Sequence, residues 1–370
     1  MIKNKNSKFQ YICLSFWRII RQPLFATIFG LLIGSIVIIL AGEYPIDIYL
    51  EMFRKSFFQP YYLMQTLTRS TPIIICAIAT AASWRAGYIN IGVEGQMIVG
   101  SFAATFCAIF IPGPPVIVMI ISIIMGMVAG AAYSLIAAVL NLKYNVSLII
   151  TTLMMNYIAS NVTSYLVAYP YRDLSGDGLA SQTVMINEGI RFLKLNPKTT
   201  FNVAFIMAII IVLLFIYLIK NTIFGYESKM SGLNASFAQY GGIKQNKVML
   251  KTMALSGAIA ALAGIAEIYG VKYRFIDGMF TTTGYAWTGL MSALIAGLNP
   301  LGIFFSSIFL SGLQVGGQSI QRTSNIPLHL STVIQCCITL FVSIKVIFNI
   351  RRKKKNIAQL SDAQDKGGDL

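Results

Sequence analysis

The sequence predicts an all-α, polytopic integral membrane protein. Hydrophobic residues make up 56% of its 370 residues and charged residues only 11%, whereas a typical soluble domain is about 25% charged. The mean hydropathy is +0.70, and long apolar runs recur along most of the chain. A helix needs about 20 apolar residues to cross the hydrocarbon core, so lipid is expected to surround most of this chain.

The apolar runs predict about ten transmembrane helices. In chain order they are residues 24–41, 61–83, 89–111, 115–140, 146–168, 201–219, 248–270, 285–297, 301–318 and 328–348. The run 285–297 is short for a crossing, which suggests a broken or re-entrant helix. Basic residues precede the first run, as in a signal peptide, but no small-residue cleavage site follows it. The first run is therefore interpreted as a retained span.

The Lys and Arg residues predict that both termini are cytoplasmic. Cytoplasmic loops are enriched in these residues, and with the N-terminus inside most of the 29 fall on the inner side. The predicted organisation is a basic cytoplasmic N-terminus at 1–23, a transmembrane domain at 24–348 and a basic cytoplasmic tail at 349–370. The net charge of +16 then indicates attraction to anionic lipid and not a nucleic-acid site.

The sequence lacks the usual catalytic constellations. His329 is the only histidine, and the five cysteines show no C-x-x-C spacing, which argues against zinc sites and Ser-His-Asp triads. No G-x-x-x-x-G-K-[ST] phosphate loop occurs. The chain is therefore predicted not to be an enzyme and to hold no metal or cofactor. If it moves a solute uphill, the energy must come from a source other than nucleotide hydrolysis by this chain.

Two connections are longer than the few residues usual between packed helices. The outer loop, 169–200, is either a docking surface for an extracytoplasmic partner or a simple cap. The inner loop, 220–247, contains an amphipathic stretch in which Leu233, Phe237 and Tyr240 share one helix face. Such a helix on the membrane surface either binds a soluble partner or serves as a plain connector.

An ionisable residue, Glu94, lies at the start of the apolar run 89–111. Polar groups at such a position are costly and usually functional. If the whole run is helical, one stripe faces a polar interior; it consists of Asn90, Glu94 and Ser101. The opposite stripe packs on a neighbouring helix; it consists of Gly92, Gln96, Gly100 and Ala103.

Two further runs carry polar residues at helical spacing. In 146–168 the stripe consists of Asn145, Thr152, Asn156, Ser160 and Thr163. These side chains either contact a neutral polar solute or bond to adjacent helices and to their own backbone. The run 248–270 has a small-residue packing edge at Gly257, Ala260, Ala261 and Gly264. Glu267 follows that edge, and an interfacial ion pair with Lys272 or Arg274 is expected.

Four motifs in this sequence resemble one known family. They are Gly87-x-x-Asn90-Ile91-Gly92-x-Glu94-Gly95-Gln96, Thr151-Thr152-Leu-Met-Met-Asn156-Tyr157, Gly232-x-Asn234 through Ala238-x-Tyr240-x-Gly242-Ile243, and Gly284-Tyr285 with Asn299-Pro300-Leu301-Gly302. In order and spacing they are similar to the permease subunits of bacterial ATP-binding-cassette (ABC) importers for nucleosides and simple sugars, the branched-chain amino acid permease-like family. The likeness runs from about residue 60 to 348, and the Glu-Gly-Gln form resembles the nucleoside branch.

The resemblance implies a type II ABC importer-like permease in the bacterial cell (inner) membrane, without a catalytic site of its own. A cytoplasmic ATPase subunit would bind ATP, a second permease would complete a heterodimer, and an extracytoplasmic solute-binding protein or lipoprotein would deliver the solute. Within the coupling loop 220–247, the stretch 232–243 matches the family's coupling helix, and its contact residues would be Gly232, Asn234, Phe237, Ala238, Gly241 and Gly242. Phe237 departs from the small alanine usual in the family. Coupling requires a stiff link from this loop into spans 201–219 and 248–270.

The expected solute is a nucleoside, with a purine nucleoside favoured. Amides, hydroxyls and aromatic rings suit such a neutral, flat, hydroxyl-rich molecule, so the candidate pathway residues are Asn90, Glu94, Asn156, Tyr285 and Trp287. The alternatives are a simple sugar such as ribose or galactose, or riboflavin. An ion-coupled secondary transporter is the alternative of a different class, although such carriers usually place several ionisable groups at mid-membrane.

Overall fold

The computed structural model describes residues 28–36, 38–40, 42–175, 180–321, 332–334 and 336–337. The described residues form helices and no named strand, with two isolated β-bridges. The chain divides into two units, Phe53–Gly316 and a smaller one of Met1–Met52 with Gly317–Leu370. In the smaller unit the Tyr49 hydroxyl donates to the Leu31 carbonyl across 2.7 Å. Most of the predicted span 328–348 lies outside the described residues, as do the termini 1–23 and 349–370.

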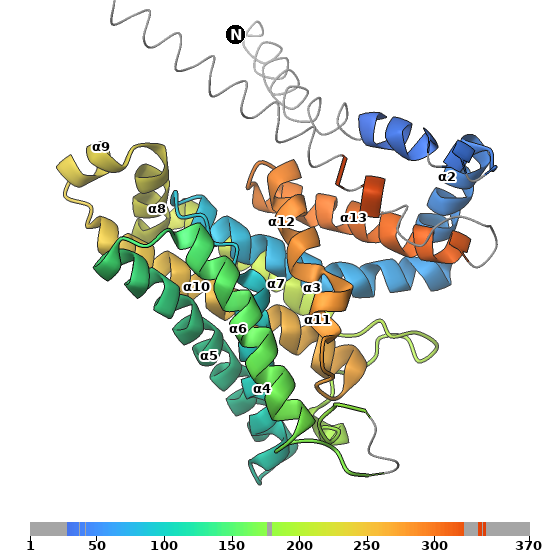
Figure 1. The fold of residues 1–370 in the computed structure, drawn as a ribbon, viewed down its shortest axis with the longest axis horizontal. Coiled ribbons are helices and arrows are strands. Elements are labelled where there is room, and N and C mark those ends of the chain that lie inside the picture. The colour runs from blue at the N-terminus through green and yellow to red at the C-terminus, as the bar shows by residue number, and fades with distance from the viewer. Residues whose placement is uncertain are drawn as a thin grey trace, which may run out of the picture. The chain divides into compact units, whose positions relative to one another are not determined.

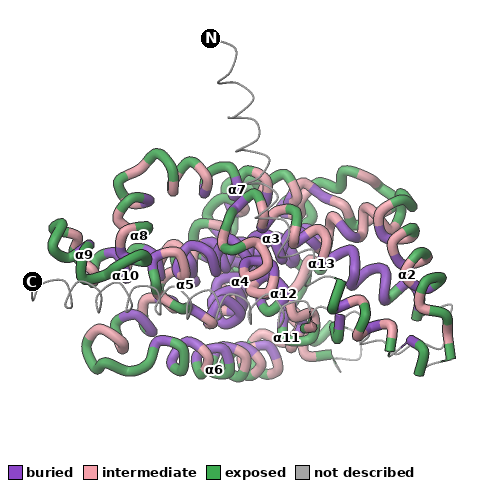
Figure 2. Tube along the Cα trace, turned by 90° about the horizontal axis from the view of Figure 1, so that it is seen from above, coloured by how far each residue is buried: buried purple, intermediate pink, exposed green. Residues whose placement is uncertain are grey.

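Four helices form the centre of the larger unit (Figures 1 and 2). They are α3 (Pro60–Trp84), α4 (Val93–Phe110), α5 (Pro115–Tyr144) and α10 (Gln245–Glu267). Helix α10 packs against each of the other three. The peripheral helices include α6 (Leu148–Ala168) and α7 (Ala204–Asn221), each of which is buried on one side and exposes apolar side chains on the other. In a membrane protein, outward-facing apolar side chains of this kind are solvated by lipid.

The centre is held together by backbones that approach closely. A Cβ added to Gly126 would lie 2.7 Å from the Gly100 carbonyl oxygen, and one added to Gly130 would lie 2.5 Å from that of Gly257. Without a hydrophobic driving force between helices in lipid, small residues permit the van der Waals contact that joins them. The predicted packing edges at Gly100 and at Gly257 are therefore confirmed.

Five described helices are long and apolar enough to cross a membrane, or six if residues 28–58 form one broken span. The five are Val93–Phe110, Pro115–Tyr144, Ala204–Asn221, Gln245–Lys272 and Pro300–Gln321, of which the last is α13. Helices α3 and α6 have span length, 25 and 21 residues, but their polar residues lower their hydropathy. The protein is thus a multi-pass, all-helical membrane protein, and the number ten stays a prediction.

The predicted short span at 285–297 forms one short helix, and the break in the chain lies just before it. Helix α11 (Met279–Thr283) ends at Gly284, whose φ of 62° turns the chain before α12 (Tyr285–Ile295) begins. At about 1.5 Å per residue, the 11 residues of α12 reach only about half of the ~30 Å hydrocarbon thickness. The positive φ is accessible to glycine at little cost, so Gly284 sets the break.

The outer loop folds as a cap on the segment that follows α10. Backbone hydrogen bonds of 2.9 Å run from Thr183 to the Phe275 carbonyl and from Ile186 to the Tyr273 carbonyl. Asp173 also lies 3.7 Å from Arg274 in an ion pair. Of the two alternatives for this loop, the cap is what the structure contains, and docking of a partner stays a prediction.

The inner loop contains two short helices. Helix α8 (Ile223–Leu233) is followed by α9 (Ala235–Tyr240), and Asn234 separates them in an extended conformation. The Asn234 side chain accepts a 3.0 Å hydrogen bond from the Phe237 amide, which is the usual capping interaction at a helix N-terminus. The predicted amphipathic stretch is therefore helical, but it is divided in two.

Candidate functional site

The motif around Glu94 begins with an irregular segment and not with a helix. Gly87 has a φ of +89°, and α4 starts only at Val93. The Asn90 side chain donates to Gln96 (3.1 Å) and to Ser256 (3.0 Å), and its oxygen accepts from the Gly92 amide at 2.9 Å. Asn90 is fully buried, and it holds the turn that leads into α4.

The predicted two-stripe arrangement of residues 89–111 is therefore wrong for Asn90 and Ser101. Asn90 and Gln96, placed on opposite stripes, are hydrogen-bonded to each other because the chain is not helical before Val93. Ser101 packs on α10, since a Cβ on Gly264 would lie 2.6 Å from the Ser101 Cβ. Only Glu94 of that stripe retains a place in a candidate solute site.

Asn156 on α6 forms hydrogen bonds to the same motif, at Ile91 and Gly95. Its oxygen accepts from the Gly95 amide at 2.8 Å, and its amide nitrogen donates to the Ile91 carbonyl at 3.1 Å. One turn earlier, the Thr152 hydroxyl accepts from the Ile91 amide at 3.2 Å. Both polar atoms of the buried Asn156 amide are thus engaged with the protein. Of the alternatives for the polar stripe of α6, bonding to a neighbouring segment is the one found for these two residues.

Glu94 and Trp287, two of the predicted pathway residues, contact each other directly. The indole Nε1 of Trp287 donates to a Glu94 carboxylate oxygen at 2.9 Å, and the Thr281 hydroxyl is a second partner of that carboxylate. Glu94 is 7% exposed, whereas Trp287 is 42% exposed. The broken helix α11–α12 therefore covers the acid and presents the tryptophan ring at the surface of this chain.

Tyr285, the remaining pathway candidate, lies beside a buried acid. It is only 5% exposed and hydrogen-bonds Glu267 of α10. The Arg69 guanidinium lies 5.8 Å from the centre of the Tyr285 ring, and the Arg69 Nε donates to Gln314 at 2.7 Å. Charges inside a membrane protein are usually paired or hydrogen-bonded in this way. Sequence reasoning missed Arg69 and Gln314 in this cluster, because neither lies in a motif.

The predicted interfacial ion pair of Glu267 is partly wrong. Glu267 is only 4% exposed. Arg274, one of its two expected partners, pairs with Asp173 of the outer loop, while Lys272 is close enough to act on Glu267 electrostatically. The folded loop decides this outcome, because it brings Asp173 to Arg274 from a hundred residues away in the chain.

The helix α9 presents an exposed apolar face. Phe237 and Tyr240 are 67% and 92% exposed, whereas Ala238 is 2% exposed. Leu233, which is 70% exposed, ends the preceding helix α8. Gly241 ends the helix, and Gly242 follows with a φ of +83°. Exposed apolar side chains gathered on one short helix mark an interaction surface more often than isolated ones do.

A hydrogen-bonded junction ties this inner loop to the Glu94 motif. Ser231 donates to the Ala86 carbonyl at 3.1 Å and to the Gln245 side chain at 2.6 Å. Tyr88 donates to the same Gln245 oxygen at 3.0 Å. Gly232 packs on the Arg85 carbonyl so closely that a Cβ there would overlap it. Ser231, Gln245 and Tyr88, here called the junction triad, were not predicted, although the glycines of both motifs signal close approach.

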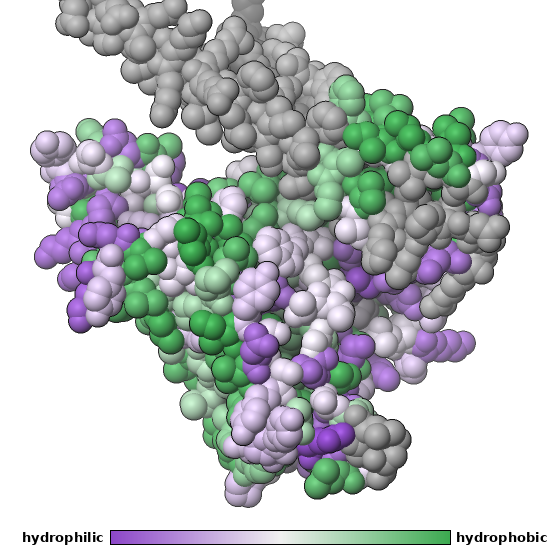
Figure 3. Space-filling model, in the orientation of Figure 1, coloured by the Kyte–Doolittle hydropathy of each residue, from purple (hydrophilic) through white to green (hydrophobic). Residues whose placement is uncertain are grey.

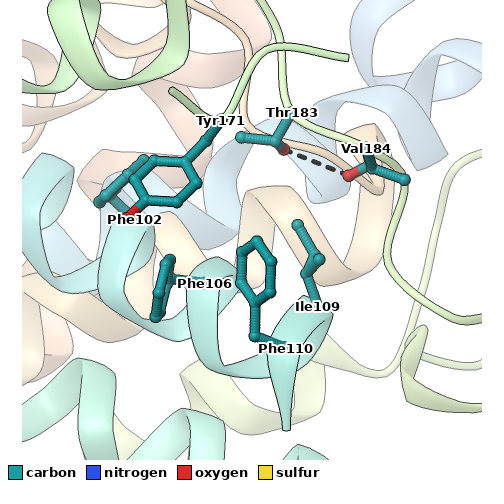
Figure 4. A pocket seen from close by; sticks show the side chains of 7 residues that line it. All are labelled: Phe102, Phe106, Ile109, Phe110, Tyr171, Thr183 and Val184. Carbon is teal, nitrogen blue, oxygen red and sulfur yellow. Dashed lines mark hydrogen bonds between the residues drawn. The ribbon is translucent and has the colours of Figure 1, made fainter. Parts of the chain in front are cut away.

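A second feature, at the far end of α4, is apolar. Figure 4 shows a small pocket there that is partly open to the outside. Its lining consists of Phe102, Phe106, Ile109, Phe110, Tyr171, Thr183 and Val184. Phe106 and Tyr171 meet edge to face with ring centres 5.2 Å apart, and the Thr183 hydroxyl donates to the Val184 carbonyl (3.2 Å) and not into the pocket. This pocket is interpreted as the seat of the outer loop on α4.

Comparisons with known proteins agree with the motifs. A family model described as "Branched-chain amino acid transport system / permease component" matches residues 62–343. The chain is 28% identical to the nucleoside ABC transporter permease protein NupB of Lactococcus lactis, over 94% of this chain and 97% of that one. It is 30% identical to the guanosine ABC transporter permease protein NupP of Bacillus subtilis, over 87% and 92% of the two chains. It is also 28% identical to the glucose ABC transporter permease protein TsgB13 of Haloferax volcanii, over 88% and 87%.

The described residues contain no group of His, Cys, Asp or Glu side chains suited to a metal ion. The relatives are permeases and not enzymes. The chain thus belongs to the family of branched-chain amino acid transport system permease components and is a multi-pass permease of an ABC transporter.

Proposed function

We propose that this chain is the permease subunit of an importer for nucleosides, with a purine nucleoside favoured. The similarity to NupB over 94% of this chain carries the proposal, and the guanosine permease NupP supports it. In this proposal the chain has about ten transmembrane helices in the bacterial cell membrane and keeps both termini in the cytoplasm. It binds no cofactor itself.

The proposed complex has three further kinds of subunit. A cytoplasmic ATPase binds and hydrolyses ATP, and a solute-binding protein or lipoprotein delivers the solute outside. A second, different permease completes the pathway. The last proposal is supported by Lactococcus lactis, which has both NupB and a second nucleoside permease, NupC, and NupC is 25% identical to this chain.

The inner loop is the proposed contact with the ATPase. Phe237 of α9 contributes an exposed apolar surface, and Asn234, Gly241 and Gly242 shape the ends of the helix. Gly232 and the buried Ala238 join that helix to the rest of the chain. The junction triad then carries a movement of α9 to residues 85–92 and so to Glu94. This route adds to the link through spans 201–219 and 248–270 that the sequence suggests.

The pathway residues fall into two proposed roles. Trp287 is the exposed ring on which a flat solute can stack, and Glu94 orients it through the 2.9 Å hydrogen bond. Asn90, Asn156 and Tyr285 are proposed to act through the shape of the pathway, because their polar atoms are occupied by the protein. They are positioning residues in this proposal and do not touch the solute.

A simple sugar is the second candidate solute, favoured by the similarity to the glucose permease TsgB13. Riboflavin is a further alternative, with the weaker support of 20% identity to the probable riboflavin import permease protein RfuC of Treponema pallidum over 86% of this chain. An ion-coupled mechanism is an alternative without such a relative. The test is uptake of labelled guanosine by cells with and without this chain, with unlabelled ribose, glucose and riboflavin as competitors and with ATP depleted in a parallel sample. Uptake that needs the chain and ATP and resists all three competitors supports the proposal. Competition by a sugar or riboflavin moves the solute class, and uptake that survives ATP depletion overturns the ABC mechanism.

A further inference from the structure

The exposed side of α6 is divided into an apolar and a polar part. At about 100° per residue, Ser164, Tyr157, Asn161 and Tyr165 lie within an arc of about 100°. On the earlier turns of the helix the same arc carries the exposed apolar side chains of Ile150 and Met154, so its polar part is limited to residues 157–165. Tyr157 and Tyr165 are 61% and 62% exposed, and Asn161 is exposed as well. The adjoining exposed arc is apolar and contains Ile158 and Val162. Figure 3 shows hydrophilic and near-neutral side chains in the region of α6, α11 and α12, next to a hydrophobic area.

A polar arc of this kind is costly against lipid. Amides and carboxylates in spans almost always face a bundle interior or a water-filled cavity. Asn161 donates to the Tyr157 carbonyl at 2.8 Å, and no described residue donates to its side-chain oxygen. Among the described residues that oxygen has no donor, and an exposed polar arc of this kind is suited to water, a solute or another subunit.

A carboxylate completes the arc at the outer end of the helix. Ser164 donates to an oxygen of Asp277 at 2.9 Å. Asp277 is exposed, and among the described residues its side chain forms no ion pair with Lys or Arg. An ionised carboxylate only accepts hydrogen bonds, so Asp277 has acceptor positions left over after Ser164.

The same segment leads to the Glu94 site. Asp277 lies directly before α11, and Thr281 of α11 is a hydrogen-bond partner of Glu94. Trp287 of α12 is the other partner. The segment 277–287 thus connects two carboxylates. Asp277 stands at its start, and its Thr281 and Trp287 side chains bind the second carboxylate, Glu94.

We propose that Asp277, Ser164 and Asn161 form a subsite for vicinal hydroxyl groups of the solute, at the outer end of the pathway. The proposal rests on the proposed function and names the part of the solute that this site recognises. A carboxylate can accept from two neighbouring hydroxyls at once, which suits the 2′- and 3′-hydroxyls of a ribose. The Asn161 oxygen adds a further acceptor, and Trp287 provides a stacking surface for the base.

The test compares guanosine with 2′-deoxyguanosine in cells that express the complete transporter. For each variant we take the uptake efficiency of guanosine over that of 2′-deoxyguanosine, and divide this selectivity ratio by the same ratio for the unchanged chain. The division cancels the selectivity of the solute-binding protein, which is the same in both measurements. We expect Asp277→Asn to lower the preference for guanosine by roughly tenfold, since hydrogen bonds to charged groups are the strong ones. Ser164→Ala, which removes only the partner of the carboxylate, is expected to lower it less.

The matched control is Glu188→Gln. Glu188 is also an outer carboxylate, but its side chain is 87% exposed and its partner among the described residues is Arg191. The selectivity ratio of Glu188→Gln should therefore not change. Membrane levels of each variant are measured by immunoblot, and Ser164→Ala serves as the second probe if Asp277→Asn is absent from the membrane. An unchanged ratio in both variants overturns the subsite. If a variant loses the second permease from the purified complex while its selectivity stays unchanged, the polar arc is a subunit interface. That result also overturns the proposed subsite. If the unchanged chain imports no nucleoside, the proposed function itself fails.

Discussion

The Trp287 indole donates a 2.9 Å hydrogen bond to the buried carboxylate of Glu94. Because Trp287 lies on the broken helix and Glu94 in the first turn of α4, this one bond joins the exposed wall of the proposed pathway to the motif that contacts the inner loop. A conformational change at the inner loop would reach the proposed pathway through this contact.

Trp287→Phe is expected to lower the rate of uptake by roughly tenfold. The phenyl ring retains a stacking surface but lacks the N–H, so Glu94 loses a charge-assisted hydrogen bond of about 1.5–3 kcal/mol. Glu94→Gln should be milder, since the amide oxygen still accepts from the indole. Initial uptake rates at saturating solute distinguish the two variants. Phe305→Leu, at an exposed position of α13, is the control, and equal effects of Trp287→Phe and Glu94→Gln would contradict this reasoning.

The exposed face of α9 predicts a separable defect in assembly. Phe237→Ala together with Tyr240→Ala should release the ATPase from the purified complex while the permease remains in the membrane, because buried aromatic anchors dominate interfaces and each contributes about 2 kcal/mol. Co-purification of the ATPase measures the effect. Leu213→Ala with Leu214→Ala, on the exposed side of α7, is the matched pair, and retention of the ATPase by the α9 variant would show that this face is a plain connector.

Three of the four glycines of the inner loop are expected to differ sharply when each is replaced by alanine. A Cβ at Gly232 would overlap the Arg85 carbonyl, so Gly232→Ala should cost about 1–3 kcal/mol through overpacking. Gly242 has open space but a φ of +83°, which costs about 1–2 kcal/mol for an L-residue. At Gly241 the nearest atom is 3.4 Å away, and the change should be nearly silent. Thermal stability of the purified complex ranks the three variants, and the opposite order would mean that the close approach at Gly232 is absent.

Loss of the junction triad is expected to uncouple ATP hydrolysis from transport. Tyr88→Phe removes the hydroxyl that donates to Gln245 without changing the packing of the ring. The ATPase still binds α9, so hydrolysis continues, but fewer solute molecules should cross for each ATP consumed. The ratio of solute transported to phosphate released is the readout, and Tyr226→Phe, at an exposed position of α8, should leave it unchanged. A parallel fall of both rates would instead indicate a defect in assembly.

The outer loop is expected to loosen in acid. Hydrogen bonds from the Ser175 side chain and backbone, together with the nearby Arg274, lower the pKa of Asp173 below its ordinary value. A carboxyl group with a lowered folded pKa stabilises the fold above its unfolded pKa of about 3.9, and the contribution is lost as the pH falls through the lowered value. The protection of the Thr183 and Ile186 amides against hydrogen exchange, relative to the intrinsic rate at the same pH, should therefore fall below about pH 4. In Asp173→Asn this acid-induced change in hydrogen exchange should disappear. If the change persists in that variant, another carboxylate causes it.

The sequence predicted those features that depend on local chemistry. The low content of charged residues implied lipid as the solvent, and the small residues around Gly100 and Gly257 marked the faces where backbones meet. The amphipathic period of α9 placed Phe237 and Tyr240 on one exposed face. The order of the motifs indicated the permease family, because residues needed for turns and close approaches keep their spacing along the chain.

Positions that depend on distant contacts could not be predicted in this way. Asn90 was placed on the wrong face because helical periodicity was extended through Gly87–Gly92, where the turn, Ser256 and Asn156 set the backbone. Arg274 was assigned to Glu267, its neighbour in sequence, although the folded outer loop delivers Asp173 to it.

By itself, then, the sequence determined the solvent, the helical fold, the packing faces and the family, since each follows from composition, period or spacing along one segment. Only the tertiary structure decided that Trp287 bonds Glu94, that Tyr285 and Arg69 surround Glu267, and that Asp277 meets Ser164. Those partners lie on different helices. The hydrogen bonds of a side chain depend on which helices pack together, and the residue pattern of one segment does not specify that packing.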